Sequence, residues 1–167
     1  MGPIDPSRLS RWFDAYGAAL SLYARQWLEA GLADDIVQDV FIRLMSQRAE
    51  PRNVKAWLFR SVRNAAISGL RSGKRRQRHE EQAAARRPAW FEARAEDLID
   101  AATAQDAMMS LPSDQREVLV LRIWATMTLR DIAELLDEPV STVFSRYQAG
   151  LEGIRNRLVL SCRTKND

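Results

Sequence analysis

The stretch TLRDIAELLDEPVSTVFSRYQAGLEGIRNR, residues 128–157, decides the fold of the rear half of this chain. It opens at Thr128 with Asp131 three residues later, the spacing of a helical capping box, and continues with apolar side chains on one face. A tight turn follows, and Ser141 is expected to cap a second helix that runs to about Cys162. Two helices joined by so short a turn are typical of a helix-turn-helix, whose second helix enters the major groove of DNA.

The second of these helices has two contrasting faces. Residues at helical spacing are expected to face the core: Val143, Tyr147, Leu151, Ile154 and Leu158. The opposite face carries small and polar side chains, which let a helix approach base edges closely. They are Ser141, Thr142, Ser145, Gln148 and Ala149, with Arg146 on the flank as a candidate contact to a guanine or a phosphate. An ordinary helical hairpin has the same pattern, so this stretch alone leaves both interpretations open.

The rest of the chain also has helical periodicity, and its few Pro and Gly residues stand between the periodic segments. Helices are expected at about residues 7–29, from 34 onward, 54–78, 96–110 and 114–124, with Asn53 and Ser113 as caps and Gly31 closing the first. The stripe of the second helix predicted to face the core consists of Ile36, Val37, Val40, Phe41, Leu44 and Met45. The fold class is therefore all-α, with two small helical domains, 1–79 and 96–167, joined by a linker over 80–95.

Charge is distributed unevenly along the chain. Residues 1–79 hold 14 Lys and Arg against 7 Asp and Glu, a net charge of +7, whereas residues 80–117 have a net charge of −5. A basic front domain favours a polyanionic partner, because clustered cations release counterions from phosphates. One cysteine and one histidine, Cys162 and His79, give neither an internal disulfide nor a Cys/His metal site. No secretion signal or membrane helix is recognisable, so we expect a cytoplasmic protein with no catalytic residues, metal or cofactor.

Two helix faces in the front domain are candidate binding surfaces. On the third helix, one arc is basic over several turns, and it carries Arg60, Arg63, Asn64, Arg71, Lys74, Arg75 and Arg78. Trp57 lies at the edge of this arc, where an aromatic ring could stack on an unpaired base, although filling the core boundary is the simpler role. On the second helix, Asp35, Gln38, Asp39 and Ile42 form a mixed face that suits a protein partner or plain solvent exposure.

Four ordered motifs resemble the sigma-70 family of RNA polymerase sigma factors, specifically its extracytoplasmic-function group. The segment ADDIVQDVF, residues 33–41, is similar to the helix that binds the polymerase clamp. The segments VKAWLFR, residues 54–60, and NAAISGLR, residues 64–71, resemble the promoter-melting helix. The short motifs LP, REVL and DIAE, which begin at Leu111, Arg116 and Asp131, resemble the start of the second domain, and PVSTVFSR, residues 139–146, its recognition helix.

The resemblance implies an alternative sigma factor that directs bacterial RNA polymerase to specific promoters and assists DNA melting. The residues it assigns to the clamp of the polymerase β′ subunit are Asp34, Asp35, Gln38, Asp39 and Ile42. Those assigned to the −10 element are Arg52, Asn53, Trp57, Arg60, Arg63, Asn64, Arg71, Lys74 and Arg75. Those assigned to the −35 element are Thr128, Ser141, Thr142, Ser145, Arg146 and Gln148. It also implies contact with the β flap, an anti-sigma partner, and a monomer when free of polymerase.

The sequence departs from the family pattern at four positions. Leu32 and Ser68 stand where acids are common, and Phe144 and Ala149 stand where the recognition helix is often basic. The last two put the usual −35 contacts in doubt. Two other functions therefore stay open: a sigma-like decoy that occupies an anti-sigma protein, and a dimeric helix-turn-helix repressor that binds a palindrome.

Overall fold

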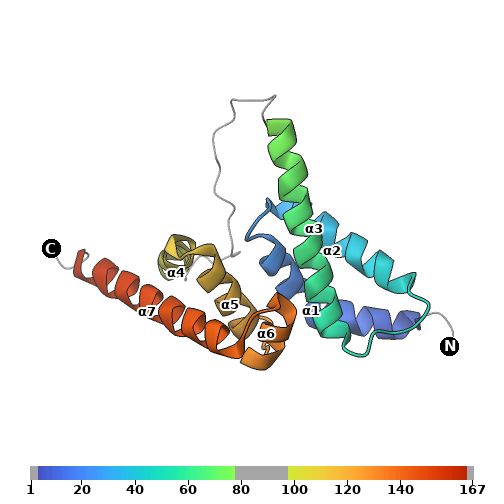
Figure 1. Ribbon diagram of the computed structural model, residues 1–167. Helices are drawn as coiled ribbons and strands as arrows, with labels where there is room; N and C mark the ends of the chain where they lie inside the picture. Colours follow the sequence, from blue (N-terminus) through green and yellow to red (C-terminus); the bar gives the residue numbers. More distant parts are fainter. Residues whose placement is uncertain (1–3, 78–97, 165–167) are drawn as a thin grey trace. The chain divides into compact units, whose positions relative to one another are not determined.

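The computed structural model describes residues 4–77 and 98–164. These ranges fold into helices and contain no strand, so the predicted all-α class is confirmed (Figure 1). The chain forms two compact units, Met1–Pro88 and Ala89–Asp167, called unit 1 and unit 2 below. The predicted linker, residues 80–95, and His79 lie outside the described residues, and so do Arg78 and the exact domain limits. The helices are α1 (Pro6–Ala24), α2 (Ala30–Met45), α3 (Val54–Gln77), α4 (Leu98–Ser110), α5 (Ser113–Ile123), α6 (Leu129–Leu136) and α7 (Val140–Thr164).

Helix α1 is shorter than predicted, and the assignment of Gly31 as its cap is wrong. Asp5 caps its N-terminus by accepting hydrogen bonds from the Ser7 hydroxyl and amide, at 2.7 and 3.0 Å, and these bonds hold the pKa of Asp5 below its usual range. The helix ends at Ala24, and α2 already begins at Ala30. Gly31 therefore lies in the first turn of α2, and no described glycine has the positive φ that a glycine C-cap requires.

In unit 1, α1, α2 and α3 pack against one another around an aliphatic and aromatic core. Tyr23 and Phe59 are fully buried, with ring centroids 5.5 Å apart, and Trp27 lies edge-on to Tyr23 at 5.1 Å. The other fully buried large side chains are Leu20, Val40, Leu44, Leu58 and Val62. Met45, which was predicted to face the core, is exposed. Phe13 on α1 is exposed as well, although its ring makes an edge contact with the ring of Phe41.

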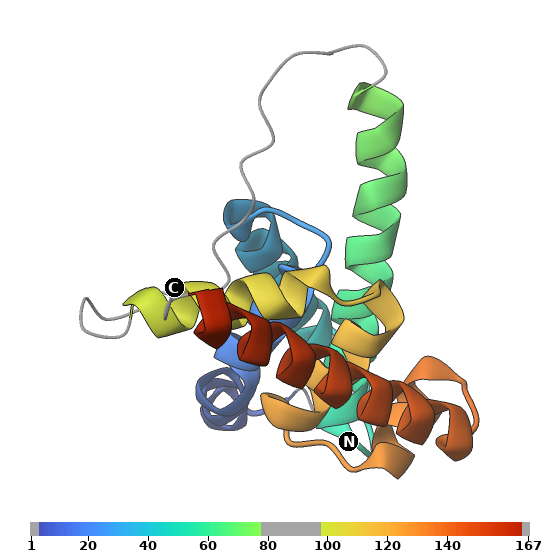
Figure 2. The same cartoon turned by 90° about the vertical axis from the view of Figure 1, so that its left-hand side faces the viewer.

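In unit 2, α7 packs against α4, α5 and α6 (Figure 2). The close approach depends on glycine: a Cβ on Gly150 would lie 2.8 Å from Leu119 Cδ1, and one on Gly153 would lie 2.6 Å from Leu111 Cδ2. The inward face of α7 therefore runs through Val143 and Gly150. Leu151 and Leu158 are exposed, so their prediction as core residues is wrong. Apolar side chains at helical spacing do not reveal that the neighbouring helix packs on a glycine.

Both caps predicted at serine in unit 2 are also wrong, Ser113 by one residue and Ser141 by two. Helix α5 begins at Ser113 after Pro112, and α7 begins at Val140 after Pro139. The Pro139 carbonyl accepts hydrogen bonds from the amides of Thr142 and Val143, at 3.0 and 3.1 Å. Each proline thus stands just before the first helical residue. It fixes the direction of the chain there through its restricted φ.

The capping box at the start of α6 is present as predicted. The Thr128 hydroxyl accepts a hydrogen bond from the Asp131 amide at 3.1 Å, and the Asp131 carboxylate accepts one from the Thr128 amide at 3.1 Å. We expect Thr128→Ala to lower the free energy of unfolding of unit 2 by about 1 kcal/mol, because it leaves an amide of the first turn unpaired. Urea denaturation measures this difference. Thr128→Ser is the matched control, and an equal loss in both variants would contradict the capping role.

Candidate protein and nucleic-acid interfaces

One face of α2 carries exposed side chains over its whole length. Asp35, Gln38 and Asp39 are exposed, as predicted, and Ile42 has 60% of its surface exposed. Leu32 and Met45, which are 57% and 50% exposed, lie on the same face and were not among the predicted site residues. These six residues fall within about 140° of the helix circumference at 100° per residue. We call them the docking stripe: Leu32, Asp35, Gln38, Asp39, Ile42 and Met45.

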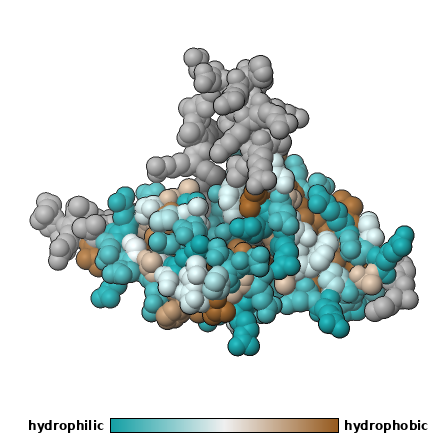
Figure 3. Space-filling view, viewed as in Figure 1, coloured by the Kyte–Doolittle hydropathy of each residue, from teal (hydrophilic) through white to brown (hydrophobic). Residues whose placement is uncertain are grey.

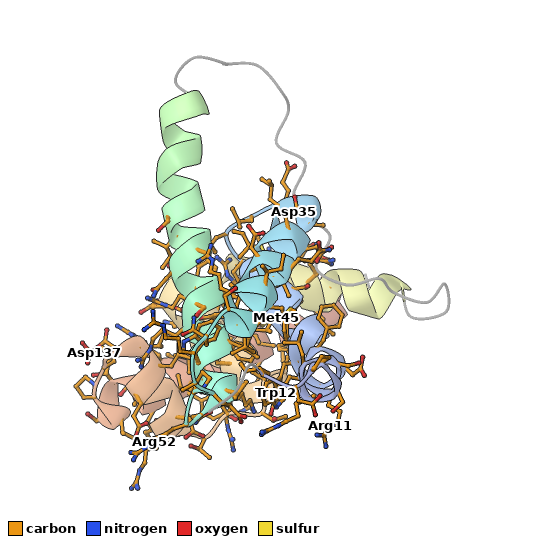
Figure 4. All side chains as sticks on the ribbon, turned by 90° about the vertical axis from the view of Figure 1, so that its right-hand side faces the viewer. Arg11, Trp12, Asp35, Met45, Arg52 and Asp137 are labelled. Atoms are coloured by element: carbon orange, nitrogen blue, oxygen red, sulfur yellow. The ribbon has the colours of Figure 1, made fainter. Side chains whose placement is uncertain are left out.

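The docking stripe combines apolar side chains with two carboxylates and one amide. Figure 4 labels Asp35 and Met45 toward opposite ends of α2, and Arg11 and Trp12 on α1. Asp34 differs from its neighbour, because its carboxylate lies 3.8 Å from the guanidinium of Arg25 in an ion pair. Single exposed apolar residues are ordinary on a protein surface, whereas three of them aligned on one helix form a candidate protein contact.

Helix α3 separates a buried face from a polar one. Val54, Leu58, Val62 and Ala66 are buried, while Arg60 and Asn64 are exposed and Arg63 is half-buried. Arg71, Lys74 and Arg75 lie on the later turns of the same helix, which extends beyond α1 and α2 in Figures 1 and 2. Their side chains lie outside the described residues. The backbone therefore continues the helix through every basic residue of the predicted arc up to Arg75.

The loop before α3 lies beside the start of this polar face. Asn53 caps α3, as predicted, since its side-chain oxygen accepts a hydrogen bond from the Ala56 amide at 3.0 Å. Arg52 is exposed in the same loop (Figure 4), and Trp57 is half-buried in the first turn of α3. Trp57 therefore lies at the boundary of the core with part of its surface exposed, as each of its two predicted roles requires.

The first turns of α7 expose most of the side chains predicted for DNA contact. Ser141, Ser145, Gln148 and Ala149 are exposed, and Thr142 is half-buried. The Thr128 hydroxyl is already engaged, since it hydrogen-bonds the Asp131 carboxylate at 2.7 Å. Two large apolar residues share this part of the helix surface, Val140 and Phe144, and Phe144 is 45% exposed. The sequence had drawn attention to Phe144 because it stands at a position that is often basic in the family it resembles.

Arg146 is held by two carboxylates. Its guanidinium lies 3.1 Å from Asp114 at the start of α5 and 3.2 Å from Glu138 in the turn before α7, and its side chain is 25% exposed. The structure therefore gives Arg146 a positioning role, in which it fixes α7 against its neighbours. From the sequence, Arg146 was a candidate contact to a guanine or a phosphate. Such a contact would compete with both ion pairs.

Beside these three surfaces, the described residues form neither a metal-binding cluster nor a membrane-spanning helix. The face drawn in Figure 3 is mostly hydrophilic, with small separate hydrophobic patches. Within residues 4–77 and 98–164, no group of three or more His, Cys, Asp or Glu side chains is arranged to hold a metal ion. None of the helices in those ranges is both long enough and apolar enough to cross a membrane.

Comparison with known proteins gives matches in both units. The model of sigma-70 region 2 matches residues 12–76, and that of sigma-70 region 4 matches residues 102–152. The chain is 28% identical over 140 residues to the ECF RNA polymerase sigma factor SigW of Bacillus subtilis, covering 75% of each chain. It is 25% identical over 149 residues to the ECF RNA polymerase sigma factor SigK of Mycobacterium sp. strain KMS, covering 80% of this chain and 73% of that one.

Solved structures show the same fold. One is the sigma factor RpoE of Bartonella quintana in complex with the anti-sigma factor NepR, with a TM-score of 0.69 at 20% identity over 92% of this chain and 98% of that one. Another is CnrH in complex with the cytosolic domain of CnrY, with a TM-score of 0.66 at 23% identity over 93% of this chain and 90% of that one. With region 2 in unit 1 and region 4 in unit 2, this chain belongs to the sigma-70 family, in its extracytoplasmic-function group of RNA polymerase sigma factors.

Proposed function

We propose that this alternative sigma factor divides promoter binding between its two units. Unit 1 binds the β′ clamp of core RNA polymerase through the docking stripe and captures the −10 element with α3. Unit 2 contacts the β flap and inserts the start of α7 into the major groove at the −35 element. The observation that carries the proposal is the correspondence of regions and units, since region 2 falls within Met1–Pro88 and region 4 within Ala89–Asp167.

Reconstituted transcription tests this function directly. The purified chain is mixed with core RNA polymerase and a genomic promoter library, and the start sites are mapped. We expect initiation at a limited set of promoters that share two spaced elements, and none with core polymerase alone. Failure to bind core polymerase even at low salt, where charge contacts are strongest, would overturn the proposal.

The basic arc of α3 supports a contact with the DNA backbone near the melted segment. We expect Arg60→Ala with Arg63→Ala to reduce the slope of log binding constant against log salt by about 1.4, because each lost contact to a single-stranded phosphate removes about 0.7 from that slope. Holoenzyme binding to a premelted promoter, measured from low to moderate salt, gives the slope. Lys55→Ala is the charge control, since Lys55 lies over the Tyr16 ring at 5.8 Å. An unchanged slope in the double variant would remove these arginines from the interface.

An anti-sigma partner is part of the proposal. One of the similar structures is a sigma factor in complex with an anti-sigma factor, and the other is CnrH in complex with the cytosolic domain of CnrY. A decoy function remains the second candidate, because Phe144 and Ala149 replace residues that are often basic in the recognition helix. A pull-down separates the two, since a decoy would capture an anti-sigma protein and no polymerase.

Further parts of the proposal follow from the polymerase role. The chain acts as a non-enzymatic initiation factor, because polymerase supplies the catalytic site. Its place of action is the cytoplasm, where polymerase and promoter DNA are found. It is a monomer when free, and a dimer in sizing experiments would instead favour the repressor alternative.

A further inference from the structure

We propose that Phe144 determines part of the −35 specificity by packing against the methyl group of a thymine. This inference rests on the proposed function, since it requires the start of α7 to lie in the major groove. It begins from the exposure of Phe144, which is 45% exposed although α7 packs against three other helices of unit 2. Val140, one turn earlier, is exposed as well, so the start of the helix presents two apolar side chains to the solvent.

The charges around α7 argue against readout of guanine at this point. From Val140 to Ile154 the sequence contains one basic residue, Arg146. Its guanidinium is shared between Asp114 and Glu138 at 3.1 and 3.2 Å. A bidentate contact to guanine would have to replace two ion pairs. Base recognition by this part of α7 therefore falls to neutral side chains.

The neutral side chains present two chemical types. Phe144 offers an apolar ring, and the thymine methyl is the one apolar group that the base edges of unmodified DNA expose in the major groove. Gln148, four residues later and also exposed, has the donor and acceptor pair that matches the major-groove edge of adenine. Residues four apart lie on the same side of a helix. Phe144 and Gln148 together therefore favour A·T pairs in the upstream element.

The test removes a single methyl group from DNA. The −35 element is first selected from a randomised upstream region with the complete holoenzyme, and each thymine of either strand is then replaced by deoxyuridine. We expect one replacement to weaken holoenzyme binding about fourfold, the value for one buried methyl-sized group. In Phe144→Ala the same replacement should have no effect, because the partner of the methyl group is gone.

The controls separate this inference from the proposed function and from misfolding. Leu158→Ala removes another exposed apolar side chain of α7 and should keep the fourfold effect. Core polymerase binding and the urea midpoint should be the same in Phe144→Ala and in the unaltered chain. If the unaltered chain does not bind core polymerase, that result overturns the proposed function itself.

Three outcomes would overturn the role of Phe144. One is the absence of any thymine whose replacement by deoxyuridine weakens binding. A second is that Phe144→Ala loses the same affinity, relative to the unaltered chain, on thymine and on deoxyuridine templates, which would assign the ring to a protein contact with polymerase. Selection of a guanine that is retained in Phe144→Ala but lost in Arg146→Ala would count against the inference in the same way.

Discussion

Replacing Asp35 and Ile42 together with alanine is expected to weaken the binding of core RNA polymerase by about ten- to a hundredfold. Ile42 is the most exposed large apolar residue of α2, at 60%, and its burial against a partner would remove that surface from water. Interface residues that lie centrally within a contact dominate its energy, and Ile42 and Asp35 lie between Leu32 and Met45 on the docking stripe. Kinetic binding to immobilised core polymerase measures the change.

The two substitutions should act on different rate constants. Loss of the Asp35 carboxylate should slow association and reduce its dependence on salt, because exposed charges steer the encounter. Loss of the Ile42 side chain should speed dissociation at every salt concentration, because apolar contact forms only in the docked complex. Measuring the single variants at two salt concentrations separates these effects.

A matched pair of substitutions away from the docking stripe provides the control. Asp14→Ala with Val159→Ala removes one exposed carboxylate from α1 and one exposed apolar side chain from α7. Its affinity for core polymerase should stay within a factor of two of the unaltered chain, as expected for substitutions outside a contact. Equal affinity in the two double variants would show that polymerase binds elsewhere.

The sequence predicted correctly those features that depend on a single helix and its own neighbouring residues. The capping box of Thr128 and Asp131 and the cap at Asn53 are each closed by atoms at most three residues apart, so their spacing alone predicted them. Periodicity likewise predicted the buried stripe of Val37, Val40 and Leu44. The all-α class followed from these local signals together.

The sequence did not predict features that depend on how a second helix packs against the first. Met45 continues the apolar stripe of α2, but no neighbouring helix covers it, and it joins Leu32 on the exposed side. Leu151 was assigned to the core because a glycine at position 150 gives no periodic signal, although α5 packs there. The charge partner of Arg146 on α5 is far away in sequence, so spacing could not predict that its guanidinium is engaged.

Phe59→Ala is expected to lower the free energy of unfolding of unit 1 by about 3 to 5 kcal/mol, the usual cost of a large cavity left by an aromatic side chain. Phe59 is fully buried and its ring lies 5.5 Å from that of Tyr23, so its removal also ends an aromatic contact between α3 and α1. Hydrogen exchange followed by mass spectrometry, in increasing urea, reports the loss for each helix separately. Phe13→Ala is the matched control, because Phe13 is exposed and should cost much less.

The same measurement tests whether the two units fold independently. Helices α1, α2 and α3 should lose protection at lower urea in Phe59→Ala, whereas α5, α6 and the first part of α7 should keep the midpoint of the unaltered chain. The reason is that the buried side chains of unit 2, such as Leu119 and Ile132, belong to contacts among α4, α5, α6 and α7. A shared shift of all helices would mean that the chain unfolds as one cooperative domain. In that case one tethered unit could not search for the −35 element while the other is held on the polymerase, and the division of promoter binding between them would fail.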